Sequence, residues 1–224
     1  MNYSIRKKII KYYKNKVALM DYLSKIEKKQ EVTKKDITQI IGLTNEVWQS
    51  WNYIFRSFWL TYYFGGETCI GNIHSNTLNI SNFLDSDNES IAFAKIGKFN
   101  KPKMPYYAEK TWGSNEMLAK ISSYYPSLAR ANLVGASLSS YGEYLNDLQK
   151  IRNTMIHLTE ASFLDLKNYL ISRNYTSPKN YYSHNHPLNF FYYKIGISPN
   201  LVYEDIFENL DSMIEAIFVY GPDI

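Results

Sequence analysis

The sequence predicts a mainly α-helical bundle with an irregular insertion between its second and third core helices. The main observation is that apolar residues recur at three- and four-residue steps along several long stretches, which is the period of amphipathic helices. Helix-capping residues precede several of these stretches, and segments rich in Gly, Pro and Asn separate them. Only short segments, 77–80 and 91–96, resemble strands.

Composition and length favour a single domain over residues 1–224. Hydrophobic residues make up 45% of the chain and aromatic residues 16%, which is enough to fill a core and excludes wholesale disorder. The net charge of +4 permits an anionic partner without requiring one. A lone Cys69, no N-terminal apolar signal and no long apolar run predict a soluble cytoplasmic protein that neither enters a membrane nor forms an internal disulfide.

The first half of the chain predicts two long helices. The first covers residues 3–29, with apolar residues on one side and many lysines on the other. Thr33 and Asp36 have capping-box spacing and are expected to open the second helix, which ends at Gly65-Gly66. Within its aromatic part, Asn52 and Arg56 lie one turn apart.

Asn52 and Arg56 are expected to form a buried polar bridge, because a charged guanidinium among aromatic residues needs a partner. For Arg56 the expected partner is an acid such as Glu46, or a group on another helix. The segment 66–111 that follows is the irregular insertion, and 77–80 and 91–96 are its candidate strands.

The second half predicts shorter helices. Ser114 caps a helix that ends near Tyr125, and a further turn or helix continues to Ala136. Ser140 and Glu143 have capping-box spacing and are expected to open the next helix, over residues 144–158.

Beyond that helix, either Thr159 or Ser162 is expected to cap another one. An aromatic loop, 174–198, leads to the last helix, 201–220, with Ser198 as its predicted cap before Pro199. Aromatic side chains of this loop are candidates for stacking on RNA bases.

Neither a metal nor a cofactor is expected. Cys69 with His74, and His184 with His186, are pairs of potential ligands, but neither pair has the further ligands that a metal site needs. No Walker loop, Gly-rich dinucleotide fingerprint or Gly-x-Ser-x-Gly elbow is present.

The stretch 144–158 carries the candidate chemistry. One side of the expected helix is an apolar stripe, formed by Leu145, Leu148, Ile151, Met155 and Leu158. Arg152 lies on the flank of this stripe, where its charge requires an acid, a carbonyl or a bound anion. Asn153 and His157 share the opposite, polar face, and His157 can move protons near neutral pH.

The pattern Arg152-Asn153-x-x-x-His157 resembles the signature of the HEPN family, in which an Arg and a polar residue precede a His near the end of a core helix. Many members of that family are metal-independent endoribonucleases in toxin, antiphage and RNA-processing systems. The resemblance implies a HEPN-like helical domain that cleaves RNA by attack of the 2′-hydroxyl, leaving a 2′,3′-cyclic phosphate. It also implies a homodimer through the motif helix, and it admits an antitoxin or defence-system partner.

In this interpretation Arg152, Asn153 and His157 are the catalytic residues. His157 moves the proton, Arg152 stabilises the phosphorane charge, and Asn153 orients His157 or donates to phosphate. On a continuous helix, Arg152 and His157 are separated by about 140°, which favours a site shared between two copies. Two alternatives are a catalytically silent HEPN-like module that binds RNA, nucleotide or protein, and an unrelated helical interaction protein in which Arg152 is salt-bridged.

Overall fold

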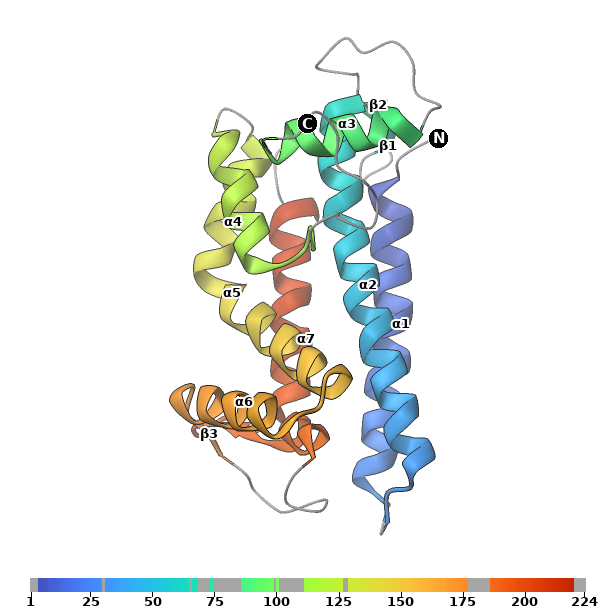
Figure 1. Cartoon of the computed structure of the whole chain (residues 1–224), viewed down its shortest axis with the longest axis vertical. Coiled ribbons are helices and arrows are strands. Elements are labelled where there is room, and N and C mark those ends of the chain that lie inside the picture. Colours follow the sequence, from blue (N-terminus) through green and yellow to red (C-terminus); the bar gives the residue numbers. More distant parts are fainter. Residues whose placement is uncertain are drawn as a thin grey trace. The chain divides into compact units, whose positions relative to one another are not determined.

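A computed structural model describes residues 4–29, 31–64, 66–67, 73–74, 86–98, 100, 111–126, 129–176 and 186–219. These residues are mainly helical, as predicted (Figure 1). The helices are α1 (Ile5–Glu27), α2 (Lys34–Phe64), α3 (Ser86–Ile96), α4 (Asn115–Tyr124), α5 (Ala129–Ile156), α6 (Glu160–Ser172) and α7 (Val202–Ile214), with a 3₁₀ helix η2 (Pro187–Tyr192) and a π-helical turn η3 (Glu215–Val219). Over these ranges no helix is both long and apolar enough to span a membrane.

The described strands form two short antiparallel pairs. β1 (Gly66–Glu67) pairs with β2 (Ile73–His74), which places a small hairpin at the start of the predicted insertion. β3 (Tyr175–Thr176) pairs with β4 (Lys194–Ile195) at the two ends of the predicted aromatic loop. Residues 77–80, the other candidate strand of the insertion, lie outside the described residues.

The chain divides into two compact units, each built from separate segments. The first contains residues 1–13, 49–140 and 213–224, and the second contains residues 14–48 and 141–212. Helices α1, α2, α5 and α7 contribute residues to both units. The single domain expected from length stays a prediction, and the two units are described one at a time.

Aromatic side chains form the core of the first unit. The ring of Phe218, in η3, lies 5.9 Å from that of Phe55 and 5.5 Å from that of Phe58, both on α2. On the same face of α2, Trp51 packs on Phe55 at 5.1 Å and lies 5.7 Å from Tyr12 of α1. These rings are fully buried, so the hydrophobic effect and ring packing hold α1, α2 and η3 together within this unit.

Arg56 in the first unit forms the polar bridge that its setting predicts, and its partner is an acid of another helix. Its Nη2 lies 3.0 Å from Oε2 of Glu89 on α3, and its guanidinium lies over the Phe93 ring at 4.5 Å. The Oδ1 of Asn52 accepts from the backbone N–H of Gly113 at 2.8 Å.

Two predicted helix starts are confirmed by their caps. Thr33 and Asp36 form the expected capping box: the Thr33 N–H donates to Oδ2 of Asp36 at 2.9 Å, and the Asp36 N–H donates to Oγ1 of Thr33 at 3.2 Å. Ser114 is the cap of α4 and accepts from the N–H of Met117. Helix α2 ends at Phe64, directly before the predicted Gly65-Gly66 stop.

Three other predictions were wrong. The candidate strand 91–96 belongs to helix α3, where Phe93 packs on Trp112 with ring centroids 4.7 Å apart. Helix α5 begins at Ala129 and continues through Ser140, so the expected cap at Ser140 does not exist. Helix α7 begins at Val202, and the hydroxyl of Ser198 accepts from the N–H of Asn200 before the helix starts.

Candidate active site

Helix α5 places the predicted site residues in the second unit. Its last turns bury Leu145, Leu148 and Ile151 completely, and Met155 is only 5% exposed. The stripe ends there, because α5 ends at Ile156 and Leu158 is 49% exposed. The expectation of a helix reaching Leu158 was therefore wrong by two residues.

Arg152 is half-buried on the flank of the apolar stripe, as predicted, and its guanidinium is held by amide oxygens. Its Nε and Nη2 donate to Oδ1 of Asn45 on α2, at 3.1 Å and 2.6 Å. Its Nη1 donates to Oδ1 of the adjacent Asn153 at 2.8 Å. This contact joins α2 and α5 and fixes the plane of the guanidinium.

The charge of Arg152 has no acidic partner among the residues that the structure describes. In contrast, Arg56 is paired with Glu89, and Arg173 is paired with Asp147. Burial lowers the pKa of the Arg152 side chain, because desolvation disfavours the charged form. Neutral oxygens satisfy its N–H groups without cancelling its charge, so the site favours an added anion. Among the described residues, the salt bridge that the alternative interpretation expects for Arg152 is therefore not present.

The side chain of Asn153 contacts Arg152, although its place on the helix suggested that it would orient His157. Its side-chain oxygen accepts from Arg152, and among the described residues its side chain makes no hydrogen bond to His157. The link to His157 is through the backbone, where the His157 N–H donates to the Asn153 carbonyl at 2.9 Å. Asn153 therefore orients the guanidinium directly, and its link to His157 does not involve its amide group.

His157 is the first residue after α5, and its side chain is exposed. The hydrogen bond from the His157 N–H to the Asn153 carbonyl has the i to i−4 spacing of an α-helix, so the backbone of His157 still continues the path of α5. Its imidazole makes no hydrogen bond within the described part of the chain, which leaves both ring nitrogens accessible to a ligand.

The backbone of His157 is fixed by the start of α6. Thr159 and Ser162 form a capping box, which confirms that the next helix is capped here and shows that both candidate residues take part. The Ser162 hydroxyl also lies 3.0 Å from the His157 carbonyl, to which it can donate. The turn between α5 and α6 is thereby tied to α6 directly beside the imidazole.

A buried carboxylate holds α6 and β3 against α5. Asp147 is fully buried and accepts from the hydroxyl of Tyr169 on α6 at 2.7 Å, and from the hydroxyl of Tyr175 on β3. Arg173 completes the cluster, with its Nη2 3.1 Å from Oδ2 of Asp147. Burial, together with the Asp147 charge, raises the pKa of both tyrosines. Figure 1 shows α6 beside β3, and this cluster is what joins them to α5.

Asn45 is the residue that the sequence did not reveal. It lies 107 positions before Arg152, and no periodicity or motif links residues so far apart. Asn45 is partly buried on α2, but its contact with Arg152 forms only when α2 and α5 pack together in the folded protein.

Of the two pairs of potential metal ligands, only His186 has a side chain within the described residues. Cys69 and His184 lie outside the described residues, as does the side chain of His74. The Nδ1 atom of His186 accepts from the N–H of Leu188 at 3.1 Å and caps η2, which is a structural role. Among the described residues, no cluster of His, Cys, Asp and Glu has the size that a metal requires.

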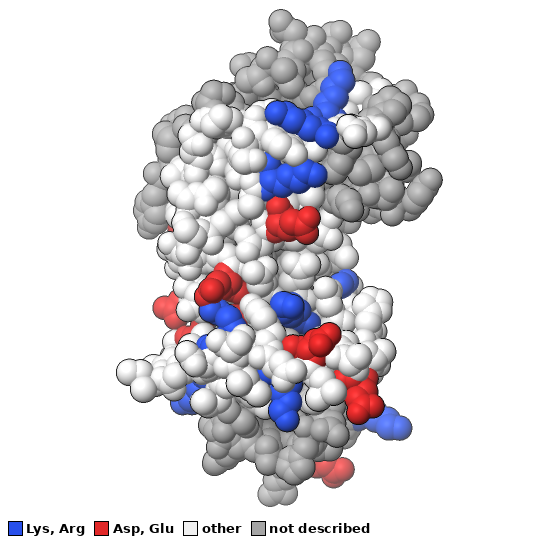
Figure 2. All heavy atoms as spheres, turned by 60° about the vertical axis from the view of Figure 1, so that its left-hand side comes forward, with Lys and Arg blue, Asp and Glu red and all other residues white. Residues whose placement is uncertain are grey.

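Charged side chains of both signs are interspersed on the face drawn in Figure 2. A broad positive field would attract any polyanion from a distance, whereas a mixed surface leaves recognition to individual cations.

Compared with known proteins, the chain matches no protein-family model, no curated protein and no solved structure. Its activity must therefore be inferred from the chemistry of the site itself.

Proposed function

We propose that this protein is a metal-independent endoribonuclease of the HEPN type, with Arg152, Asn153 and His157 as its site. The observation that carries the proposal is the environment of Arg152, a half-buried guanidinium held by two neutral amide oxygens. A cation arranged in this way is ready to stabilise the negative charge that develops on a phosphorane. It also stands at the position where the resemblance requires an arginine.

The proposed reaction needs one base and one acid. His157 takes the proton from a 2′-hydroxyl, whose oxygen forms a bond to phosphorus while the bond from phosphorus to the 5′-oxygen breaks. The leaving 5′-oxygen takes up a proton, and the products are a 2′,3′-cyclic phosphate and a 5′-hydroxyl. Arg152 supports the equatorial phosphate oxygens through this step, and Asn153 keeps its guanidinium in place.

A second copy of the chain would complete this arrangement. One imidazole cannot serve as base and acid in the same step, so a two-fold pairing that adds another His157 supplies the missing group. Ile156 and Leu158, which flank His157 in the sequence, are 36% and 49% exposed. Of these two, Ile156 is the apolar side chain that such a homodimer would cover. We place the protein among cytoplasmic toxin or antiphage effectors, a role that a controlled RNA-cleaving activity fits.

The test is incubation of the purified protein with tRNA and mixed RNA in EDTA. The wild type should produce fragments that end in a 2′,3′-cyclic phosphate. His157→Ala and Arg152→Ala should each reduce the rate by about a hundredfold or more, because each removes a group that acts in the transition state. Arg6→Ala is the matched control, since Arg6 is an exposed arginine far from the motif in the sequence.

The melting temperature of each variant shows whether the fold survives. Cleavage that persists in both motif variants would reveal a contaminating nuclease and contradict the proposal. An inactive wild type that still binds RNA through Arg152 would favour the alternative of a catalytically silent binding module.

A further inference from the structure

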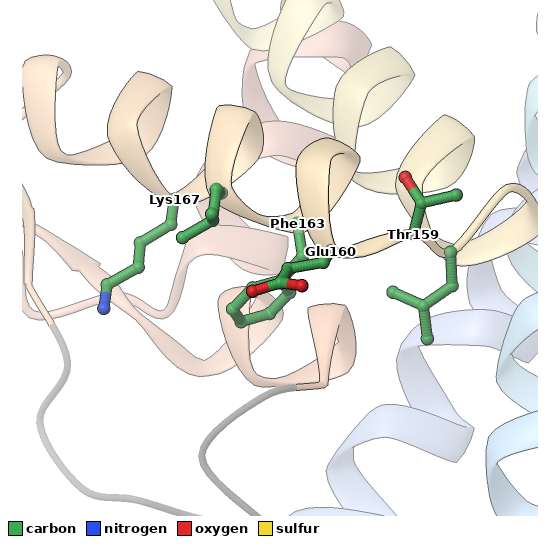
Figure 3. A pocket seen from close by; sticks show the side chains of 6 residues that line it. Thr159, Glu160, Phe163 and Lys167 are labelled. Carbon is green, nitrogen blue, oxygen red and sulfur yellow. The ribbon is translucent and has the colours of Figure 1, made fainter.

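A pocket lies along α6, directly after His157 in the chain. It has a volume of about 430 Å³, which is within the range of small-molecule sites. Its lining consists of Leu158, Thr159, Glu160, Phe163, Leu164 and Lys167. Figure 3 shows Lys167 at one end, Thr159 at the other, and Glu160 and Phe163 between them.

An aromatic ring with a fixed position provides the apolar part of this pocket. Phe163 packs on the buried Phe190, with ring centroids 5.5 Å apart and planes inclined by 33°. The exposed side chains of Leu158 and Leu164 extend the apolar surface beside it. A supported ring of this kind is the platform on which proteins stack an unpaired RNA base.

Two charged residues along the pocket would orient a bound nucleotide. Glu160 and Lys167 are separated by two turns of α6, a rise of about 10 Å. Both are exposed, and neither forms an ion pair with a residue that the structure describes. Lys167 attracts a phosphate and Glu160 repels one, so a nucleotide would place its phosphate towards Lys167 and its base towards Glu160.

The carboxylate of Glu160 selects among bases. An ionised carboxylate only accepts hydrogen bonds, and its two oxygens lie side by side. The Watson–Crick edge of guanine presents two neighbouring N–H donors to such a group. In adenine a ring nitrogen that only accepts hydrogen bonds replaces one of these donors. Its lone pair would face a carboxylate oxygen, which also only accepts, so the two would repel each other.

We propose that this pocket is a guanine-binding subsite, which holds a guanosine of the RNA next to the bond that is cut. The inference rests on the proposed RNA chemistry of Arg152 and His157, and it adds a base preference that their motif does not specify. The turn of Leu158 and Thr159 joins the catalytic imidazole to the pocket, so a base held here has a fixed place relative to His157.

Titration with mononucleotides tests the subsite without any cleavage. The wild-type protein, labelled with ¹⁵N, is titrated with 5′-GMP and 5′-AMP while the amide signals of α6 are followed by NMR. We expect 5′-GMP to bind about tenfold more tightly than 5′-AMP, because hydrogen bonds to a charged group discriminate by that order. Glu160→Gln should remove this preference, and Lys167→Met should weaken both nucleotides.

Asp165→Asn is the matched control for Glu160→Gln. Asp165 is an exposed acid of the same helix that does not line the pocket, so its neutralisation should leave binding unchanged. Equal affinity for the two nucleotides, no binding at millimolar concentration, or binding that survives both pocket variants would overturn the guanine subsite.

RNA cleavage separates this inference from the proposed function. If both hold, wild-type cuts should cluster at guanosines and Glu160→Gln should spread them over all bases. Guanine binding without RNA cleavage would leave the subsite standing and refute the nuclease. Cleavage without base preference, together with no nucleotide binding, would support the nuclease and refute the guanine subsite.

Discussion

The Nη2 atom of Arg152 lies 2.6 Å from Oδ1 of Asn45, so a cation of α5 is held by a neutral residue of α2. An aspartate would fit the same space and would pair with the guanidinium, yet the chain carries an asparagine there. The neutral acceptor keeps the positive charge available, which is what a phosphate-binding site requires.

Asn45→Asp should therefore reduce RNA cleavage without destabilising the protein. The new carboxylate neutralises Arg152 and competes with the substrate phosphate, and we expect the rate to fall about tenfold or more. Urea unfolding should show unchanged or higher stability, because an ion pair replaces a hydrogen bond to a neutral group. Asn168→Asp, an exposed position on α6, adds the same charge and should leave the rate nearly unchanged. A fully active Asn45→Asp would show that the free charge of Arg152 has no part in the reaction.

Gly113 is a position where any side chain meets the core of the first unit. A Cβ atom there would lie 2.5 Å from Cδ1 and 2.8 Å from Nε1 of the buried Trp51. Gly113→Ala should lower the free energy of unfolding by about 1–3 kcal/mol, since neither the indole nor the backbone can move freely. At Gly42, within α2, a Cβ atom would have no neighbour within 4 Å beyond the adjacent residues and the nearby backbone of the helix itself. Gly42→Ala should instead stabilise by about 0.5–1 kcal/mol, and equal effects of the two changes in urea unfolding would contradict the close packing.

The Asp36 carboxylate makes the folding stability of the protein depend on pH in the acid range. Hydrogen bonds from Lys29 and then from Thr33 hold the pKa of the Asp36 carboxyl far below its usual range. A lowered folded-state pKa contributes stability above the unfolded value of about 3.9, and this contribution is lost as pH falls below it. Asp36→Asn should cost about 1 kcal/mol at neutral pH, as a damaged cap does. It should also flatten the loss of stability between neutral and acid pH.

Urea unfolding at several pH values measures both effects of Asp36→Asn. Asp21→Asn, at an exposed position of α1, provides the control and should follow the wild-type curve. Parallel pH curves for the wild type and Asp36→Asn would mean that the capping box does not distinguish the charged carboxylate from an amide.

Local sequence signals predicted the parts of the fold that depend on neighbouring residues. The caps at Thr33, Ser114 and Thr159 were all readable, because a cap bonds to the backbone within three residues of itself. The same local reasoning failed at Ser140, where capping-box spacing occurs inside α5 without ending or starting a helix. Helix formation there is decided by the long run of residues on both sides, and a polar residue in the middle is tolerated.

Tertiary contacts decided what the sequence could not. The apolar run 91–96 is too short for periodicity to distinguish a strand from a helix. In α3 it places Phe93 against both Trp112 and the guanidinium of Arg56, contacts between segments distant in sequence. The candidate site follows the same division: residues 152, 153 and 157 belong to one motif, whereas Asn45 is known only from the fold.

Ser162 should act as a positioning residue for His157. Its hydroxyl lies 3.0 Å from the His157 carbonyl and also belongs to the capping box of α6. Ser162→Ala should lower stability by about 1 kcal/mol through the lost cap, and should reduce RNA cleavage by about tenfold because the turn that carries the imidazole is released. Ser162→Thr retains a hydroxyl and should restore most of the activity.

Ser172→Ala provides the comparison that separates positioning from stability. Ser172 is an exposed serine of the same helix whose hydroxyl also bonds a backbone carbonyl, that of Tyr169. Its loss should leave the rate and the His157 ring signals in the NMR spectrum unchanged, whereas Ser162→Ala should shift those signals. If Ser162→Ala lowers the melting temperature but alters neither the ring signals nor the rate, then Ser162 only caps α6, and the His157 turn keeps its conformation without it.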